Sequence, residues 1–525
     1  MTFVFATGRN TLSLALAIGS CMLALASACP VHADVPDGFT SLFNGKDLSG
    51  WKGLVGNPKS RAAMSDEELA AAQEKADQEM RAHWSVVDGA LQYDGNGNSL
   101  CTEKDYGDFE LYVDWKILPK GDSGIYLRGS PQIQIWDPGL GGTGPNRPAQ
   151  GSGGLYNNQR HPNAPLVKAD HPVGQWNTFF IRMVGQYVTV KLNGQLVVDN
   201  VPLENYWERD KPIYPRGQIE LQHHGNKLWF RNIFIREIDA DESNRILREK
   251  NADQFTSVFN GTDLSGWEGS TNSYHVVDGA IVCKEGKGGT LFTSQIYSNF
   301  VARVEFQLPA DGNNGLAIRY PGDGNAHLNG MCEIQILGEG YRDIENLDPR
   351  QLHGSIYGLV AAHQGYLRPP GEWNFQQVTV IGPFVNVELN GHPVVAAQLR
   401  GIGQSKDGDV YPNVGRKRGH FGLVGHSDPV AFRNISIWDL AGERPEHNAA
   451  PVTPREKPIQ LFNGENLDGF YTWISDCGYA DPRRVFTVRD GLLHISGDGY
   501  GGLITERAYR DYHLVIEFKW GERTW

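Results

Sequence analysis

The chain has 525 residues, a formal net charge of -13, 63 glycines and 28 prolines. This length allows two or three hydrophobic cores, and the glycine- and aromatic-rich composition favours a β-rich, loop-rich protein. The acidic balance argues against a nucleic-acid partner, which would require a concentrated basic surface.

The N-terminus has the pattern of an export signal. Arg9 precedes an apolar run over residues 11–28, and Val31-His32-Ala33 forms a small-x-small cleavage site. We expect residues 1–33 to be a signal peptide, which predicts a periplasmic, secreted or cell-surface protein. Residues 26–29 loosely resemble a lipobox, so a lipoprotein is an alternative. No other stretch approaches the length of a transmembrane helix.

A nine-residue pattern, Phe-Asn-Gly-x-x-Leu-x-Gly-Trp, divides the chain. It occurs at residues 43–51 and 259–267, and in a looser form at 462–470, roughly two hundred residues apart, which is about the length of one all-β domain. We expect complete domains at 37–239 and 254–440 and an incomplete third copy at 458–525. A copy that stops after its first strands would leave strand edges uncovered, which favours a fragment of a longer protein over a natural end at Trp525.

Strand and turn signals follow in the same order in each copy. Asp-Gly dipeptides between apolar residues predict hairpins at 84–91 and 274–281, and Asn-Gly dipeptides end longer hairpins in both complete copies. Apolar residues alternate over 106–117, which predicts a half-buried strand that is repeated at 297–308 and 509–520.

Helical signals are few. Ser65 and Glu68 form a capping box before a helix that reaches His83, an insertion without a counterpart in the second copy. The charged linker at 239–253 could be a short helix, and the Pro-rich linker at 441–457 is expected to be extended.

This pattern predicts an all-β fold of tandem two-sheet sandwiches or jelly rolls, with a short helical insertion in the first. A parallel α/β fold is excluded, because no helices separate the strands. After cleavage at Ala33 four cysteines would remain, and we expect buried thiols or one incidental bridge. They are Cys101, Cys283, Cys332 and Cys477. None has metal-ligand spacing.

Several further motifs carry a resemblance to a known family. These are the opening pattern, the Val-Val-Asp-Gly hairpin, Phe-Arg-Asn-Ile before the last strand of each complete copy, and the segments 123–128, 333–336 and 371–374. In this order they resemble the 3-keto-disaccharide hydrolase family, which has a concanavalin A-like sandwich fold. The resemblance implies an exported hydrolase acting on oxidised glycosides, with its site on the concave sheet. The same fold also hosts purely sugar-binding modules.

The chemistry of such an enzyme defines what to look for. A ketone at C3 of a sugar acidifies the C2 proton, so a base can remove it and the C1 substituent can leave by elimination. Water then adds to the unsaturated product, giving net hydrolysis. This requires a base with a pKa near ambient pH and a cation or hydrogen-bond donors at the enolate oxygen. A divalent metal ion could meet the second need.

The second domain offers a fitting set of side chains. Arg319 could hold an enolate or sugar oxygen, Glu333 and Gln335 share one strand face, and Tyr357 could stack on a pyranose. His426 is the best candidate for the base or a metal ligand. Each has a structural alternative: Arg319 as a surface charge paired with Glu333, and the others as packing or hydrogen-bonding residues. His353 and His363 are expected to be loop residues.

The first domain repeats most of this set, with one exchange. Arg128 and His224 stand at the places of the second domain's catalytic candidates, and substrate-binding candidates are Gln132, Gln134, Tyr156 and Asp137. Gln132 replaces Glu333, and an amide cannot act as a base. Asp137 could supply a displaced carboxylate. Asp114, Glu305 and Glu517 share one strand position in the three copies and could line the concave face or lie solvated on the other.

The leading hypothesis is therefore an exported hydrolase of 3-keto-glycosides, with an oxidised sugar as its partner. The alternatives are a non-catalytic carbohydrate-binding protein and a cell-surface adhesion protein.

Overall fold

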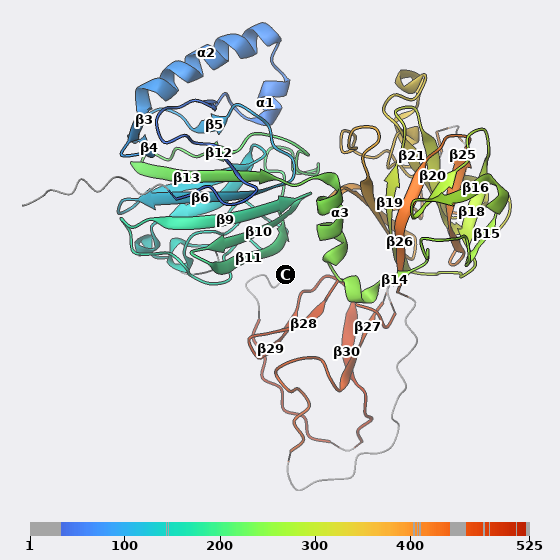
Figure 1. The fold of residues 1–525 in the computed structure, drawn as a ribbon. Coiled ribbons are helices and arrows are strands. Elements are labelled where there is room, and N and C mark those ends of the chain that lie inside the picture. The colour runs from blue at the N-terminus through green and yellow to red at the C-terminus, as the bar shows by residue number, and fades with distance from the viewer. Residues whose placement is uncertain are drawn as a thin grey trace, which may run out of the picture.

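The computed structural model describes residues 33–142, 144, 146–402, 405–406, 408, 411–440, 458–475, 478–481, 483–510 and 512–520. The expected signal peptide (apart from Ala33), the linker at 441–457 and Cys477 lie outside this range. The described chain forms two complete β sandwiches joined by one helix, with a smaller third unit beside them (Figure 1). No described helix is long and apolar enough to cross a membrane.

The first sandwich has an eight-stranded and a five-stranded antiparallel sheet. The larger sheet has the order β11-β10-β9-β6-β13-β4-β3, with β1 on β13, and the smaller has the order β2-β5-β12-β7-β8. The strands of the larger sheet are β1 (Thr40–Ser41), β3 (Trp84–Val87), β4 (Ala90–Tyr93), β6 (Phe109–Ile117), β9 (Asn177–Val184), β10 (Tyr187–Leu192), β11 (Gln195–Pro202) and β13 (Leu228–Glu237). Those of the smaller sheet are β2 (Trp51–Gly53), β5 (Leu100–Thr102), β7 (Asp122–Leu127), β8 (Ser130–Trp136) and β12 (Glu220–Leu221). Two 3-10 turns, η1 (Pro138–Leu140) and η2 (Pro148–Gln150), follow β8.

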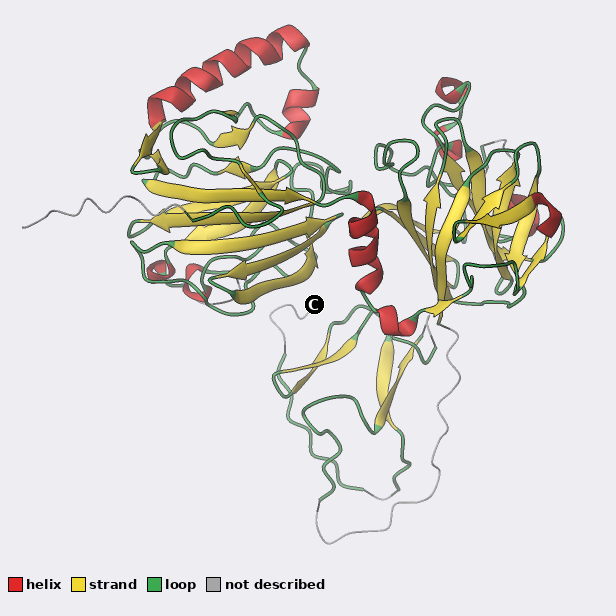
Figure 2. Cartoon of the chain, viewed as in Figure 1, coloured by secondary structure: helices red, strands yellow, loops and turns green. Residues whose placement is uncertain are grey.

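The second sandwich repeats this topology. Its larger sheet has the order β16-β17-β26-β19-β22-β23-β24, with β14 on β26, and its smaller sheet has the order β15-β18-β25-β20-β21. The larger sheet contains β14 (Thr256–Ser257), β16 (Tyr274–Val277), β17 (Ala280–Cys283), β19 (Phe300–Gln307), β22 (Asn374–Ile381), β23 (Phe384–Leu389), β24 (His392–Gln398) and β26 (Ala431–Asp439). The smaller sheet contains β15 (Trp267–Gly269), β18 (Gly288–Thr293), β20 (Asn313–Tyr320), β21 (Cys332–Leu337) and β25 (His420–His426). Its helical turns are α4 (Ala326–Asn329), η4 (Thr271–Ser273), η5 (Ile344–Asn346) and η6 (Pro349–Gln351). The expected all-β sandwich fold is confirmed, and helices are few (Figure 2).

The apolar residues that alternate along the predicted strands fill the space between the sheets. On β6, Phe109, Leu111, Val113 and Trp115 are buried in the first core. Asp114, on the opposite face of the strand, accepts hydrogen bonds from Thr178 and Asn232. Its counterpart in the second sandwich, Glu305, is paired with Arg433 and Arg248. Both acidic residues therefore belong to the larger sheets, away from the face that carries Glu333.

The helical insertion consists of α1 (Pro58–Ala62) and α2 (Asp66–His83), and Figure 1 shows it beside the smaller sheet of the first sandwich. The predicted capping box of Ser65 and Glu68 is present. Asp77 accepts a hydrogen bond from the backbone of Gly53 on β2, and a side chain at that glycine would lie 2.1 Å from a carbonyl oxygen of α2. The insertion is thus packed tightly onto strand β2.

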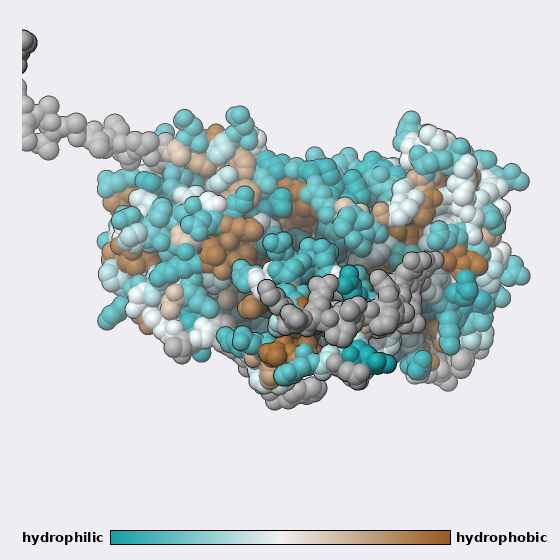
Figure 3. Space-filling model, turned by 90° about the horizontal axis from the view of Figure 1, so that it is seen from below, coloured by the Kyte–Doolittle hydropathy of each residue, from teal (hydrophilic) through white to brown (hydrophobic). Residues whose placement is uncertain are grey.

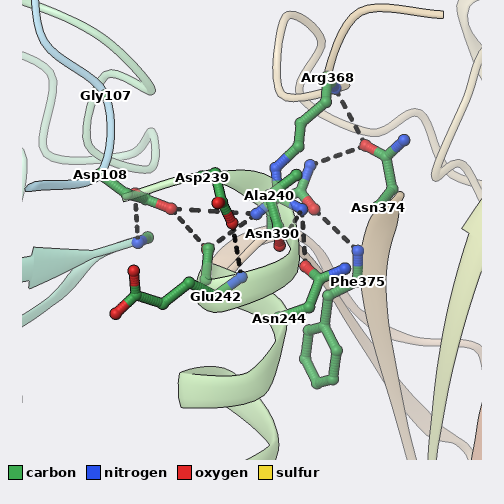
Figure 4. A network of polar contacts seen from close by, with 12 residues as sticks. Gly107, Asp108, Asp239, Ala240, Glu242, Asn244, Arg368, Asn374, Phe375 and Asn390 are labelled. Carbon is green, nitrogen blue, oxygen red and sulfur yellow. Dashed lines mark hydrogen bonds and ion pairs between the residues drawn. The ribbon is translucent and has the colours of Figure 1, made fainter. Parts of the chain in front are cut away.

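The linker between the sandwiches is helical, as the charged segment suggested. It contains α3 (Ala240–Glu249), capped by Asp239, and the 3-10 turn η3 (Ala252–Gln254). Figure 4 shows the polar network at its N-terminal end, where Asp108 of the first sandwich faces Arg368 of the second. Asp108 is ion-paired with buried Arg128 at 2.6 Å and accepts a hydrogen bond from Ser243 of α3. Arg368 donates to Ser243 and Asn244, so both sandwiches are bonded to the same helix.

The third copy forms two antiparallel strand pairs, β27 (Phe470–Ile474) with β30 (Gly501–Thr505) and β28 (Phe486–Arg489) with β29 (Leu492–Ile495). A small apolar cluster packs it against the second sandwich through Val301 and Ile381. Seen from below, the surface is largely hydrophilic with separate hydrophobic patches (Figure 3).

One predicted element of the third copy is wrong. The strand expected at 509–520 is not formed in the described residues 512–520, where Val515, Phe518 and Trp520 are more than two-thirds exposed. In the complete copies this strand lies between two later strands, β9 and β13 or β22 and β26. The given sequence has no counterparts of those strands in the third copy, so the segment has no ladder to join.

Candidate functional site on the smaller sheet of the second sandwich

Glu333 lies in a row of residues that crosses the smaller sheet on its outward face. The strand register places Ala317, Gly422 and Phe292 beside it in turn on β20, β25 and β18. On its other side, the backbone of Tyr357 donates to the Glu333 carbonyl oxygen. Small residues at the centre of the row leave the carboxylate room above the sheet, with aromatic rings at both ends.

Gly315 allows the carboxylate to cross the neighbouring strand. It pairs with Gln335, one row away, and a side chain on it would lie 2.1 Å from Glu333 Oε1. Because nothing projects there, Glu333 extends over β20 towards β25. A buried carboxylate is costly unless it is paired, and this reach brings it to a partner.

Two histidines flank the carboxylate. His426, the last residue of β25, places Nε2 3.6 Å from Glu333 Oε1, and His327 of α4 places Nδ1 3.6 Å from Oε2. These distances suit ion pairs rather than hydrogen bonds. Glu333 is only 3% exposed, whereas His426 is open to solvent. His426, with 44% of its side chain exposed against 23% for His327, is thus the member of the cluster most open to a ligand.

The pKa values of this cluster are shifted by mutual contact. Burial opposes ionisation of Glu333, but the two imidazoles outweigh that effect and hold the pKa of the carboxyl below its usual value. The facing carboxylate in turn raises the pKa of His426 above its usual value. Glu333 is therefore anionic near neutral pH, and His426 retains its proton to a higher pH than a free histidine.

Aromatic rings enclose the His327 side of the site. His327 packs against Tyr357 and Tyr411, with ring centroids 5.1 and 5.7 Å apart. Gln351 donates a hydrogen bond to the Tyr357 hydroxyl. A second group, Phe292 with Tyr320, packs on the same face beside Ala317. Such surfaces suit the apolar faces of a pyranose ring.

Gln335 has a positioning role. Its amide donates to Asn313 at 2.9 Å, and the backbone of Asn313 donates to Asp428, two residues after His426. Gln335 therefore connects β21 to the turn that carries His426, and it lies one row from Glu333 on the same face.

Arg319 lies elsewhere than the sequence suggested. It is 2% exposed and donates to the backbone carbonyls of Ser298, Gly382 and Arg416. The strand has a bulge between Ala317 and Tyr320, and Arg319 has a φ of 48°, which breaks the alternation of side chains. The guanidinium is thus directed to carbonyls at the end of the sandwich. No ion pair with Glu333 is formed, so the predicted surface-charge alternative is also wrong.

Arg128 has the same environment in the first sandwich, with Gly107 and Gly185 as carbonyl partners and Asp108 as counter-ion. It also lies 3.3 Å from His392 of the second sandwich. Both arginines hold backbone segments together.

The first sandwich arranges its other residues differently. Gln132 donates to Gln134, which donates to Asp122, and Asp122 lies 3.6 Å from His224. The carboxylate is therefore on β7 in the first sandwich and on β21 in the second. In the second sandwich, Asn313 on β20 occupies the place of Asp122. No counterpart of α4 separates β7 from β8, so His327 has no equivalent.

Two further residues of the first sandwich have structural contacts. Tyr156 packs edge-on against Trp136, with ring centroids 5.6 Å apart. Asp137 caps η1, accepting from the backbones of Gly139 and Lys120. Because its carboxylate is used in this turn, it does not replace Glu333.

The implied metal ion has no matching ligand set in the described part of the chain. No group of three or more histidine, cysteine, aspartate or glutamate side chains there has a geometry that could hold one. Glu333, His327 and His426 are paired with one another instead. His353 is buried, burial lowers its pKa to about 3, and it accepts a hydrogen bond from the Leu337 backbone. The free cysteines Cys101, Cys283 and Cys332 are buried.

Three elements of this site were not predicted. His327 lies in a Gly- and Asn-rich loop whose only sequence signal is its absence from the first copy. Gly315 and Tyr411 have no distinguishing pattern. The role of all three in the site becomes apparent only from the strand register.

Comparison with known proteins assigns the chain to a family. A model described as the 3-keto-alpha-glucoside-1,2-lyase-like domain matches residues 38–236, 254–438 and 457–524. These segments cover most of the sequence, so the chain belongs to this family, and the resemblance read from the motifs is confirmed.

Individual relatives are more distant. A 3-keto-disaccharide hydrolase from Bacteroides thetaiotaomicron is 24% identical over 261 residues, covering 40% of this chain and 81% of the relative. Among solved structures, a protein provisionally named as a glycosyl hydrolase from Parabacteroides distasonis is 26% identical. That match covers 36% of this chain and 96% of the other, with a TM-score of 0.32. A carbohydrate-binding module from Bacillus subtilis is 14% identical, covering 33% of this chain and 95% of the module, with a TM-score of 0.22.

Proposed function

We propose that the second sandwich is an exported hydrolase that cleaves 3-keto-glycosides, including 3-keto-disaccharides, by elimination and rehydration. The observation that carries this proposal is the buried Glu333 carboxylate with an imidazole on either side. The name of the Bacteroides relative supports the substrate class.

The shared carboxylate suits acid–base chemistry. The Glu333 carboxylate raises the pKa of His426, and it lies 3.6 Å from each of the two imidazoles. An elimination needs a base for the C2 proton and an acid for the departing oxygen, and an imidazole can serve as either.

The reaction can be followed bond by bond. His426 takes the C2 proton, and the electron pair of that C–H bond passes into the enolate of the C3 ketone. Hydrogen-bond donors at the enolate oxygen would lower this barrier, and the candidates for this role are His327 and Tyr357, whose rings pack against each other. The C1–O bond then breaks, its electron pair passes to the leaving oxygen, and this oxygen takes the proton held by His426. Water then adds across the C1–C2 double bond, with its hydroxyl group going to C1 and a proton to C2. The products are the 3-keto sugar and the free alcohol.

Deuterium oxide distinguishes this route from direct displacement at C1. The full chain is incubated with a 3-keto disaccharide in deuterium oxide, and the product is analysed by NMR. Elimination and rehydration predict deuterium at C2 of the released 3-keto sugar. Release without C2 label would refute the elimination route, and release that persists in His426→Ala would refute its role as base.

The alternative is a non-catalytic carbohydrate-binding protein. It predicts saturable binding of keto sugars, without product release, and the same affinity in Glu333→Gln. Export is a separate part of the proposal, supported by the pattern of residues 1–33. Fractionation of cells expressing the full gene tests it, with cytoplasmic retention of an unprocessed chain as the contrary result.

A further inference from the structure

Three side chains along one edge-to-edge run of the first sandwich each have a buried oxygen without a hydrogen-bond partner among the described residues. Gln218, Glu220 and Gln222 are two residues apart around β12, so they project from the same outward face. In each of them the Oε1 atom is buried and has no hydrogen-bond partner in the described part of the chain. Glu220 is 2% and Gln218 is 7% exposed. Buried polar oxygens without partners are rare, and three in a line indicate an absent set of donors.

The second sandwich lacks this line. Glu220 pairs with Tyr126 in the first sandwich as Gly422 pairs with Ala317 in the second, so Gly422 is the counterpart of Glu220. Two residues to either side, Val424 is the counterpart of Gln222, and His420 is the counterpart of Gln218. Gly422 and Val424 carry no polar side-chain atoms, and His420 is bonded to the carbonyl of Thr293. The unpartnered oxygens are thus a property of the first copy rather than of the fold.

The helical insertion contributes to this burial. A methyl group placed on Gly129 would lie 2.6 Å from Pro58 of α1 and 3.4 Å from Glu220 Oε1. Pro58 therefore lies close to the carboxyl, and Arg61 of the same helix is near enough to influence it. Burial nevertheless raises the pKa of Glu220 to about 8, so this carboxyl is mostly neutral at pH 7 and can both donate and accept.

The spacing of the oxygens excludes a single ion as their common partner. Residues 218 and 222 are separated by about 13 Å along an extended strand, far more than the spread of oxygens around one cation. The three Oε1 atoms form a line of hydrogen-bond acceptors, and the neutral carboxyl and the amide groups can also donate. This combination matches a ligand with many hydroxyl groups. Tyr126 adds a hydroxyl, which receives a hydrogen bond from Gln222 Nε2, and Tyr206 nearby is 40% exposed.

We propose that the outward face of the smaller sheet in the first sandwich binds an unoxidised, hydroxyl-rich sugar chain without cleaving it. Gln218, Glu220 and Gln222 accept and donate hydrogen bonds to successive hydroxyls, and the helical insertion holds one side of the site closed. We do not expect cleavage there, because the Asp122 carboxylate has a single imidazole, His224, beside it and no residue corresponds to His327. The first domain would thereby hold a glycan next to the second.

Binding of two unoxidised trisaccharides, maltotriose and cellotriose, to the full chain tests this proposal. Calorimetric titrations use a Glu333→Gln background, so that any hydrolysis is suppressed and failure of the proposed function does not affect the result. We expect saturable binding of at least one trisaccharide. Replacement of Gln218 and Gln222 together by leucine should weaken it at least tenfold, with the unfolding temperature unchanged or higher.

The control is Val424→Ala, at the position in the second sandwich that corresponds to Gln222. It should leave trisaccharide affinity within twofold. The proposal is overturned if neither trisaccharide binds, if the double leucine variant retains full affinity, or if Val424→Ala abolishes binding while the leucine variant does not. In the second case water molecules satisfy the three oxygens and no sugar site exists there.

Discussion

In the proposed reaction, the carboxylate of Glu333 acts through its two histidines rather than on a substrate directly. It is buried behind them, and each imidazole has its other nitrogen directed away from the carboxylate. Glu333 is thus a positioning residue in the proposed reaction, and its removal should change the protonation of His426 as well as the rate.

Glu333→Gln should lower hydrolysis of a 3-keto disaccharide by about 100- to 10,000-fold, the range expected for general acid–base catalysis. The carboxylate raises the pKa of His426, and a base must be unprotonated to act. Activity of the natural protein should therefore fall as pH decreases through that raised pKa. In the variant this acidic limb should move to lower pH.

The pH dependence of kcat/KM for both proteins gives the measurement. A merely structural Glu333 would lower activity equally at all pH values, with no movement of the limb. Thermal unfolding of both proteins checks that the variant remains folded.

Glu220 offers a residue-level test of stability in the first sandwich. Its pKa is raised by burial to about 8, so the folded state holds a proton that the unfolded chain loses above about pH 4.5. Native stability from this group is present at acidic pH and decreases as pH rises towards 8. Glu220→Gln should therefore stabilise the protein at pH 8 relative to pH 4.5, since each pKa unit corresponds to about 1.4 kcal/mol.

Chemical unfolding at the two pH values checks this, and a difference of the opposite sign would contradict it. Arg61, Cys101 and Tyr126 are ionisable groups beside this carboxyl. Burial raises the pKa of Cys101 to about 12 and raises that of Tyr126 above its usual value, so neither group titrates over this range.

At the scale of the strand, the proposed site of the second sandwich depends on the absence of a side chain at Gly315. Gly315 leaves the space over β20 that Glu333 crosses to reach His426. Its backbone does not have a positive φ, so alanine is compatible with the strand conformation there. The carboxylate, however, would have to move.

Gly315→Ala should lower activity at least tenfold without removing any chemical group from the site. Gly124, at the same place in the first sandwich, lies against Gln132 and provides the matched control. Gly124→Ala should leave hydrolysis unchanged. Equal activity of both variants would show that the position of Glu333 does not matter.

The elements also show what a sequence can and cannot reveal. Alternation along β6 and the Asp-Gly and Asn-Gly turns depend on local chemistry, so the sandwich fold and its hairpins were predictable. The role of Arg319 was not, because its bulge and φ of 48° break the alternation on which the prediction relied. His327 was missed because its approach to Glu333 is set by contacts between strands that no local pattern encodes.

At the scale of the whole molecule, the two sandwiches share one buried ion-pair network. Asp108 neutralises Arg128, which is fully buried, and faces Arg368 across the linker helix α3. The two guanidinium groups outweigh the effect of burial and hold the pKa of Asp108 below its usual value. This contribution to stability is present above about pH 4 and is lost as pH falls through the lowered pKa.

Asp108→Ala should lower the free energy of unfolding by about 3–5 kcal/mol, because it leaves a buried arginine without its counter-ion. Glu285→Ala, on an exposed turn, removes one negative charge from the surface and should change stability by less than about 0.5 kcal/mol. Denaturant unfolding compares the two. Equal stability of the variants would show that the network does not hold the sandwiches together.

The helix α3 has a consequence for how two sugar sites would work together. Both sandwiches are bonded to it, and the backbone of Gln186 donates directly to Gly391 of the second sandwich. A glycan held by the first domain would thus meet the second at a fixed separation, with a high effective concentration for chain lengths that span it and almost none for shorter ones. The linker helix would thus make binding across both domains depend on the length of the glycan.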